Sequence, residues 1–384
     1  MPGNEVIGSE EKKELLDIFE NGGVLFRHGF DSLRGNCFKV AEFEESFAKK
    51  FNSHHSLALT SGTAALRVAL AAVGIGAGDE VITSAFTFVA TVEAIIEARA
   101  TPRCAEIDET LNIDPRLIEQ LVNENTKAVI VVHMLGVPCD MFAIRQVCER
   151  HNLILIEDTA WGCGATLNGV PLGTFGDIGV FSFDYAKTIT TGEGGMLITN
   201  NEKIYQNAAA WHDHGHENNP QVPRWKDTRS SSGFNFRMTE MQGAIGVAQL
   251  RKLDKIIKNQ TDHHAKLSEL IKCFDKLSVR PMPNGSKPSC DAFIFSTPSS
   301  EAALECRQVL IENGVNTKIL PEAITWHFAE HWDHMPELVN AHHGALRFNR
   351  SRDFLERCVS LPISVHATDL DVAKVEKSLQ QVAL

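Results

Sequence analysis

The chain has 384 residues, which is long for a single compact core and predicts two domains. Its composition of 43% hydrophobic and 22% charged residues is ordinary for a soluble globular protein. The net charge of -12 argues against a general binder of nucleic acids or of anionic membranes. No apolar run is long enough to span a bilayer. From the charge and the absence of such a run, we expect neither nucleic acid nor membrane as a partner.

The cysteine pattern and the first five residues predict where in the cell the protein resides. The nine cysteines are scattered and form no C-x-x-C pair, which favours a reducing environment over a disulfide framework. The stretch from Met1 to Glu5 shows no basic region followed by an apolar core, so no signal peptide is expected. The sequence therefore predicts a cytoplasmic protein.

The first part of the chain alternates between predicted strands and helices. Two helices are expected before the alternation begins, at 9–21 and 40–51. Short apolar runs then predict strands at 56–60, 80–83, 102–107, 127–132, 153–157, 178–183 and 195–199. The helices between them are expected at 63–73, 89–97, from Pro115 onward, and at 141–151. Near-continuous apolar strands separated by helices are typical of an α/β fold with a mostly parallel sheet covered on both faces.

The alternation ends near residue 200. A long polar stretch without clear periodicity follows at 212–232, and such loops are often functional. The longest helical pattern, at 238–259, is expected to connect two domains. The remainder mixes short strands with helices, and two of these helices are expected at 300–313 and 369–382. We therefore predict a large domain of residues 1–255 and a smaller α+β domain of residues 256–384.

A lysine and an aspartate each follow a predicted strand. Lys187 stands between the strand at 178–183 and a glycine-rich turn, and Asp158 ends an apolar strand. Each has an ordinary explanation, as a surface lysine on a turn and as a carboxylate that caps the next helix. Together they are what pyridoxal phosphate (PLP) chemistry needs: an amine for a Schiff base and a carboxylate for the protonated ring nitrogen. Burial would lower the pKa of the amine and make it nucleophilic.

Small residues open the helix predicted at 63–73. Gly62, Thr63 and Ala64 follow a strand, and free backbone N–H groups at a helix N-terminus form a ready phosphate site. The hydroxyl of Ser182, at the end of its own strand, could donate to the same phosphate. The simpler interpretations are an ordinary helix cap and a buried serine bonded to the backbone.

Two further segments combine aromatic and polar residues. Phe88 follows a strand and could stack on a pyridine ring, although most phenylalanines simply belong to the core. Asn235 and Arg237 lie between aromatic residues just before the longest helix, which is typical of an anchored loop. The alternative is a plain turn with Thr239 as the helix cap.

These motifs occur in an order that resembles the DegT/DnrJ/StrS sugar aminotransferases, PLP enzymes of fold type I. The resemblance is carried by residues 61–66, 86–91, 157–158 and 182–195. It implies that Lys187 is the Schiff-base lysine and that Asp158 is the partner of the pyridine nitrogen. It further implies a stacking and phosphate-binding set of Phe88, Gly62, Thr63, Ala64 and Ser182. Asn235 matches an asparagine that reaches the phosphate of the neighbouring subunit, so the resemblance implies a homodimer with shared sites.

The sequence also departs from the family pattern. Trp161 stands where the family usually has Gln or His near the 3-oxygen of the cofactor, and an indole N–H can donate a hydrogen bond but cannot accept one. Asp184 stands where His is frequent. Some sugar dehydratases of the family carry His in place of the lysine. Because this chain keeps Lys187, transamination is the favoured reaction, with L-glutamate as the implied donor and a keto or aldehyde sugar as the acceptor.

One subgroup is especially similar. Residues 182–184, 188–190 and 213–216 resemble the enzyme that aminates C8 of 3-deoxy-manno-octulosonate for lipopolysaccharide, whereas residues 217–229 do not fit that pattern. A nucleotide-linked keto sugar is therefore an alternative acceptor. Other readings are a PLP-dependent sugar dehydratase, a PLP enzyme of another reaction type such as a decarboxylase, and a non-catalytic regulator with a PLP fold.

Alternating histidines raise the question of a metal. His212, His214 and His216 alternate, and 327, 331 and 334 are histidines that would share one helical face. No accompanying Cys or Glu pattern supports a zinc site, so we expect none. We expect His212, His214, His216 and Arg237 to bind substrate hydroxyls or a carboxylate, and residues 327–334 to form a polar helix face.

Overall fold

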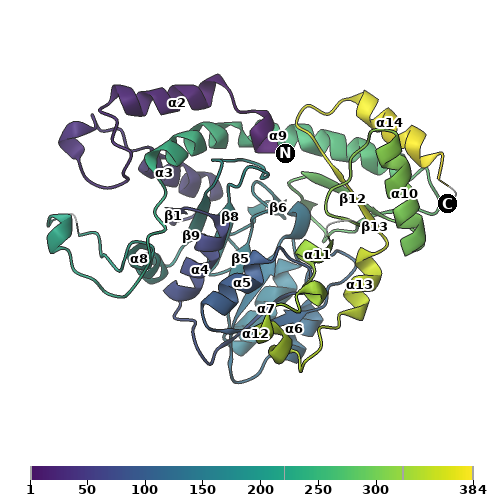
Figure 1. Cartoon of the computed structure of the whole chain (residues 1–384), viewed down its shortest axis with the longest axis horizontal. Helices are drawn as coiled ribbons and strands as arrows, with labels where there is room; N and C mark the ends of the chain where they lie inside the picture. Colours follow the sequence, from purple (N-terminus) through teal and green to yellow (C-terminus); the bar gives the residue numbers. More distant parts are fainter. Residues whose placement is uncertain (1, 220, 322–323, 383–384) are drawn as a thin grey trace.

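The computed structural model describes residues 2–219, 221–321 and 324–382. A seven-stranded sheet forms the centre, in the order β1-β9-β8-β5-β4-β2-β3 (Figure 1). The strands are β1 (His55–Leu59), β2 (Glu80–Ser84), β3 (Thr101–Ala105), β4 (Thr126–Val132), β5 (Ile154–Asp158), β8 (Ile178–Ser182) and β9 (Gly195–Thr199). All neighbours pair in parallel except β9, which is antiparallel to both β1 and β8. The predicted mostly parallel sheet is confirmed.

Helices cover both faces of this sheet. Successive strand residues alternate between the faces, so Val81 packs on one side and Ile82 on the other. One face is covered by α4 (Gly62–Ala72), α5 (Ala90–Glu97) and α8 (Glu202–Trp211). The opposite face is covered by α3 (Lys39–Phe51), α6 (Pro115–Leu121), α7 (Met141–His151) and α9 (Glu240–Ile271). Each predicted helix in this region exists within a few residues of its expected bounds.

The helix α9 is longer than its sequence pattern indicates. It continues past the predicted end at residue 259 because Leu267 and Ile271 are buried in a second core. That core lies under a three-stranded antiparallel sheet of β10 (Ser278–Val279), β12 (Ala292–Ser296) and β13 (Cys358–Pro362), with α10 (Ser300–Glu312) and α14 (Asp369–Leu379) packed on it. Figure 1 shows α9 running from the N-terminal helix α2 (Ser9–Glu20) toward this sheet. The division after residue 255 falls within α9 and stays a prediction.

The histidines at 327, 331 and 334 do not share one helix face, because α11 (Ile324–His327) ends at the first and a separate 3-10 turn (Ala329–His331) contains the second. That prediction was wrong. In the polar stretch at 212–232, the described residues, 212–219 and 221–232, form a loop apart from a short 3-10 turn at Arg224–Lys226. Within the described residues, no helix combines the length and apolarity needed to cross a membrane.

Candidate active site

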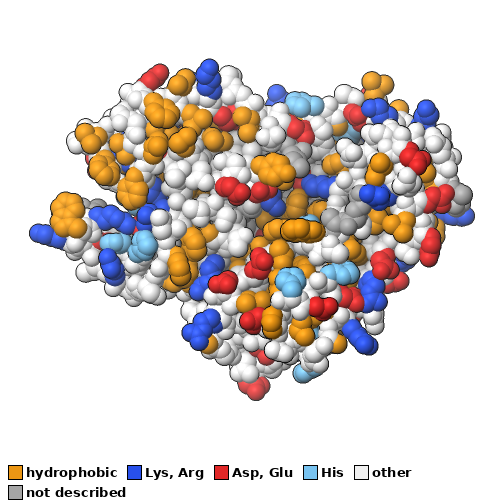
Figure 2. All heavy atoms as spheres, in the orientation of Figure 1, with side chains coloured by type: hydrophobic (Ala, Val, Ile, Leu, Met, Phe, Trp, Pro, Cys, Tyr) orange, Lys and Arg blue, Asp and Glu red, His pale blue; other side chains and the backbone are white. Residues whose placement is uncertain are grey.

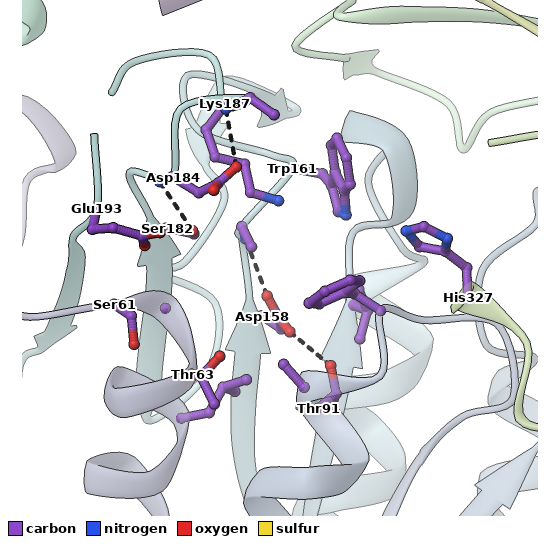
Figure 3. Close-up of a pocket in the computed structure, with 17 residues that line it drawn as sticks. Ser61, Thr63, Thr91, Asp158, Trp161, Ser182, Asp184, Lys187, Glu193 and His327 are labelled. Carbon is purple, nitrogen blue, oxygen red and sulfur yellow. Dashed lines mark hydrogen bonds between the residues drawn. The ribbon is translucent and has the colours of Figure 1, made fainter. Parts of the chain in front are cut away.

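Most of the cofactor-binding residues predicted from sequence meet at one edge of the central sheet. The strands β1, β5 and β8 run in the same direction, so their carboxyl ends lie together. A cavity of about 330 Å³ opens at this edge (Figure 3). From the predicted set it is lined by Gly62, Thr63, Phe88, Asp158, Trp161, Ser182 and Lys187.

Lys187 is held in the loop between β8 and β9. Its backbone N–H donates to the carbonyl of Asp184 at 3.0 Å, which closes a turn and directs the side chain into the cavity. The residue is only 9% exposed, and its Nζ lies 3.7 Å from the centroid of the Trp161 ring. Burial lowers the pKa of Lys187 to about 8. A much larger fraction of this amine than of an ordinary lysine is therefore neutral, and hence nucleophilic, near neutral pH.

Asp158 ends β5 beneath the lysine. One carboxylate oxygen accepts the Thr91 hydroxyl at 3.0 Å and the other accepts the Ala160 N–H at 3.1 Å, so its orientation is fixed. Burial raises the pKa of Asp158, an effect that these two bonds and the charge of Lys187 reduce. Because burial disfavours the charged form of this carboxylate, a further cationic N–H donor would stabilise it.

The first turn of α4 faces β8 across the cavity. Ser61 caps the helix by accepting the N–H of Ala64 at 3.0 Å. The N–H groups of Gly62 and Thr63, which come earlier in the turn, have no intrahelical partners because a helix has no carbonyl groups before its first turn. A Cβ atom on Gly62 would lie 2.8 Å from the Cβ of Ser182, so glycine is what allows this close approach. Ala64 does not line the cavity, and its N–H is already bonded to the Ser61 side chain.

Aromatic side chains form the opposite wall. Phe88 is 40% exposed, and its ring centroid lies 5.5 Å from that of His327. Trp161 lies 6.5 Å from the same imidazole. The buried indole Nε1 of Trp161 has no hydrogen-bond partner among the described residues, and Figure 3 shows it directed toward the cavity. A buried N–H donor that is left unpaired beside a cavity indicates that a ligand acceptor belongs there.

These groups fit pyridoxal phosphate. The cavity presents a buried amine, a buried carboxylate, the first turn of α4 beside a serine hydroxyl, and an unpaired indole N–H. Those are donors and acceptors suited to an aldehyde, a ring nitrogen, a phosphate and a ring oxygen respectively. The residues present therefore match the cofactor that the sequence predicts.

The histidine-rich loop lies outside this cavity. His212 is 1% exposed, its Nδ1 lies 2.6 Å from the carbonyl oxygen of Ala209, and burial lowers its pKa to about 3. His216 pairs with Asp227 at 3.1 Å, and His214 is exposed. No group of three His, Cys, Asp or Glu side chains that could hold a metal ion occurs among the described residues.

Arg237 and Asn235 are also separate from the Lys187 cavity. Arg237 forms an ion pair with the buried carboxylate of Asp213, which Arg224 also contacts. This pairing holds the pKa of Asp213 far below its usual range, against the effect of burial. Asn235 is exposed. Substrate binding by His212, His214, His216 and Arg237 stays a prediction.

Sequence reasoning missed several residues that line the cavity, among them Thr91 and His327. Thr91, which fixes Asp158, lies one helical turn from Phe88 but carries no signal of its own. His327 was considered only as a metal ligand or as part of a polar face. It reaches the cavity through backbone pairing of its segment with residues 85–87, a contact between distant parts of the chain that no local pattern could indicate.

Comparison with known proteins agrees with this architecture. Residues 28–380 match the model of the DegT/DnrJ/EryC1/StrS aminotransferase family. GDP-perosamine synthase of Vibrio cholerae is 39% identical over 67% of this chain and 66% of its own length. Spore coat polysaccharide biosynthesis protein SpsC of Bacillus subtilis is 31% identical over 98% of this chain and 95% of its own. The crystal structure of NtdA from Bacillus subtilis with bound cofactor PMP superimposes with a TM-score of 0.84 at 24% identity, covering 99% of this chain and 83% of that one.

The fold and the cavity define a fold type I aminotransferase that depends on PLP. The chain belongs to the DegT/DnrJ/EryC1/StrS family, whose enzymes are PLP-dependent sugar aminotransferases. The predicted family, fold class, enzyme class and cofactor are confirmed.

Proposed function

We propose that this protein transfers the amino group of an amino acid, L-glutamate, to a keto or aldehyde sugar that is built into a cell-surface polysaccharide. The observation that carries the proposal is the buried pair of Lys187 and Asp158 on one cavity. An amine with a pKa of about 8 and a fixed carboxylate are the two groups that this reaction requires of the protein. The donor leaves as its 2-oxo acid, and the sugar carbonyl becomes a carbon bearing the amine.

The protein's part in the reaction is to hold the cofactor and to move protons. When bound, PLP carries the amino group between the two substrates and accepts the electrons released at the reacting carbon. With the cofactor bound, the neutral form of the Lys187 amine, which lines this cavity, would take the proton from the reacting carbon of the substrate and would later give it back. Asp158, held by Thr91 and Ala160, keeps the ring nitrogen protonated. The N-terminus of α4 and Ser182 hold the phosphate, Phe88 supports the ring, and Trp161 donates to the ring oxygen.

Two acceptors are supported by different observations. The resemblance of residues 182–184, 188–190 and 213–216 favours C8 of 3-deoxy-manno-octulosonate in lipopolysaccharide synthesis. The 39% identity to a GDP-perosamine synthase favours a nucleotide-linked keto sugar. Retention of Lys187 favours aminotransfer over dehydration, and intact cofactor-binding groups disfavour a purely regulatory protein.

We further propose a homodimer in which Asn235 of each subunit serves the site of the other. Asn235 is exposed and outside the cavity of its own chain, as such a role requires. Exposed apolar side chains offer a contact surface, and Figure 2 shows them gathered over the region where α2 lies in Figure 1. They include Leu16, Phe19, Phe30 and Leu33. Residence in the cytoplasm stays a prediction from the cysteines.

The test is a panel of acceptors offered with L-glutamate to the purified, PLP-loaded protein. Release of 2-oxoglutarate that depends on one carbonyl sugar, with the amino sugar identified by mass spectrometry, would establish the function. An 8-aldehyde of 3-deoxy-manno-octulosonate and several nucleotide-linked keto sugars distinguish the two acceptors. Absence of amino-sugar formation from every carbonyl sugar would overturn the proposal.

A further inference from the structure

The loop that carries Lys187 has no regular structure of its own. Residues 183–194 connect β8 to β9 and contain neither helix nor strand. Segments of this kind move readily unless other parts of the chain hold them. The N–H of Lys187 is bonded within the loop, to the carbonyl of Asp184. A fixed position of the amine over the cavity requires that the rest of the loop be held as well.

Gly3 holds the loop at the other backbone group of the lysine. Its N–H donates to the carbonyl of Lys187 at 3.1 Å. Gly3 is buried, and an added Cβ would lie 2.8 Å from the backbone nitrogen of Thr190 and 2.9 Å from the carbonyl carbon of Ile189. These backbone atoms cannot turn aside as the end of a flexible side chain can. Glycine is therefore what lets the chain approach the lysine loop so closely.

A buried chain of polar side chains makes a second contact with the loop. The Oε1 of Gln249, on α9, accepts the N–H of Thr190 at 3.2 Å, and its Nε2 donates to Glu11 of α2 at 2.9 Å. Gln249 is fully buried and Glu11 is 2% exposed. The carboxylate of Glu11 also forms an ion pair of 2.7 Å with Lys252. Because buried polar groups that are paired hold their geometry, this chain fixes the backbone three residues beyond Lys187.

The first residues of the chain are themselves anchored on two sides. The carboxylate of Glu5 accepts the hydroxyl of Ser364 at 2.6 Å and the N–H of Val365 at 2.7 Å, just after β13. The carbonyl of Val6 accepts a bond of 2.7 Å from the Nζ of Lys252, on α9. Figure 1 shows this end of the chain beside α9. The contacts therefore join the lysine loop to α9 and to the segment after β13.

We propose that residues 2–11 form a strap that positions the amine of Lys187 for its reaction, with Gly3 and Glu11 as the positioning residues. Neither residue lines the cavity, so each acts only through the loop. The inference rests on the proposed function, because it takes Lys187 as the reactive amine. A displacement of about 1 Å in a reacting group can cost about a hundredfold in rate, so a small shift of this loop should be measurable.

The test compares Gly3→Ala with Gly8→Ala, a control in the same segment whose new Cβ would meet no neighbour. Stopped-flow absorption gives the rate at which each apoprotein captures PLP. The PLP-loaded proteins are then titrated with L-glutamate, and the loss of visible absorption gives a dissociation constant and a limiting rate. We expect the capture rate and the limiting rate to fall about tenfold in Gly3→Ala, while the dissociation constant changes little. Gly8→Ala should match the wild type in all three.

Glu11→Ala and Glu11→Gln repeat the test at the second contact, so that the inference stays testable if Gly3→Ala does not fold. Alanine removes the acceptor of the Gln249 amide and should slow both rates, whereas glutamine keeps an acceptor oxygen and should recover part of the loss. Thermal melts establish that each variant is folded at the temperature of the assay.

Wild-type rates in folded Gly3→Ala or Glu11→Ala, even with a lower melting temperature, would show a merely structural role and overturn the inference while the proposed function stands. An equal loss of rate in Gly8→Ala would overturn it too. A wild type that captures PLP but whose absorption no amino acid changes would overturn the proposed function, and the capture rates would still decide whether the strap positions the lysine.

Discussion

The Nζ of Lys187 lies 3.7 Å from the centroid of the Trp161 indole ring. The contact joins the loop after β8 to the turn after β5, and it holds the amine over the same cavity that Asp158 borders. The face of an indole attracts an ammonium group, which opposes the effect of burial on the lysine. Trp161 therefore acts on the lysine through its ring, and we predict that its unpaired N–H donates to a bound ligand.

Replacement of the lysine should abolish the reaction. Without the Lys187 amine no side chain on the cavity, among the described residues, can attach the cofactor and move the proton in the same way. We expect Lys187→Ala to lose turnover by on the order of a thousandfold or more. Steady-state release of 2-oxoglutarate measures this, with a thermal melt as the folding control. Substantial transamination by a folded variant would contradict the assigned role.

Replacement of Asp158 should weaken the electron-accepting function of the cofactor. Asp158→Asn keeps the size of the side chain but removes the negative charge, and we expect turnover to fall by about a hundredfold or more. Thr91→Val, which removes one of the two hydrogen bonds that orient the carboxylate and keeps its charge, should lose less. If Asp158→Asn turns over like the wild type, the carboxylate is not the partner of the ring nitrogen.

Cofactor capture should depend on pH through Lys187. The neutral amine attacks the aldehyde, so the rate at which apoprotein captures PLP should rise with pH and level off above about 8, the pKa to which burial lowers this group. The charge of Asp158 raises that pKa, so Asp158→Asn should shift the profile toward lower pH. Stopped-flow absorption measures both curves. A wild-type profile that keeps rising to the pH of an ordinary lysine would contradict the burial of the amine.

The close approach of α4 and β8 predicts an effect of a single methyl group. In Gly62→Ala the new Cβ would lie 2.8 Å from the Cβ of Ser182, which forces the two apart. We expect the affinity for PLP to fall several-fold, because the strain lies at the turn predicted to bind the phosphate, and we expect some loss of thermal stability from the same clash. Fluorescence titration of apoprotein with PLP reports the affinity. Gly74→Ala, beyond the other end of α4, is the control for replacing a glycine in this region, because its new Cβ would meet no neighbour. Its positive φ should cost some stability, but its affinity for PLP should stay unchanged.

The sequence predicted the layered sheet because each strand is a short apolar run bounded by turn residues. The residues at strand ends, Asp158 and Ser182, could be placed together for the same reason, since parallel strands share one carboxyl edge. The full length of α9 could not be predicted from the sequence, because its second half is buried only against the C-terminal sheet. His327 was missed because its position depends on pairing with residues 85–87, which local periodicity does not record.

The most direct test of the central claim is the absorption spectrum of the purified, PLP-loaded protein before and after L-glutamate is added. We predict a visible band from the lysine-bound cofactor that disappears with the donor, while 2-oxoglutarate appears in equal amount. A protein that stays colourless with added PLP would contradict the assignment of Lys187. A visible band that no amino acid removes would contradict aminotransfer and favour a different reaction or a binding role.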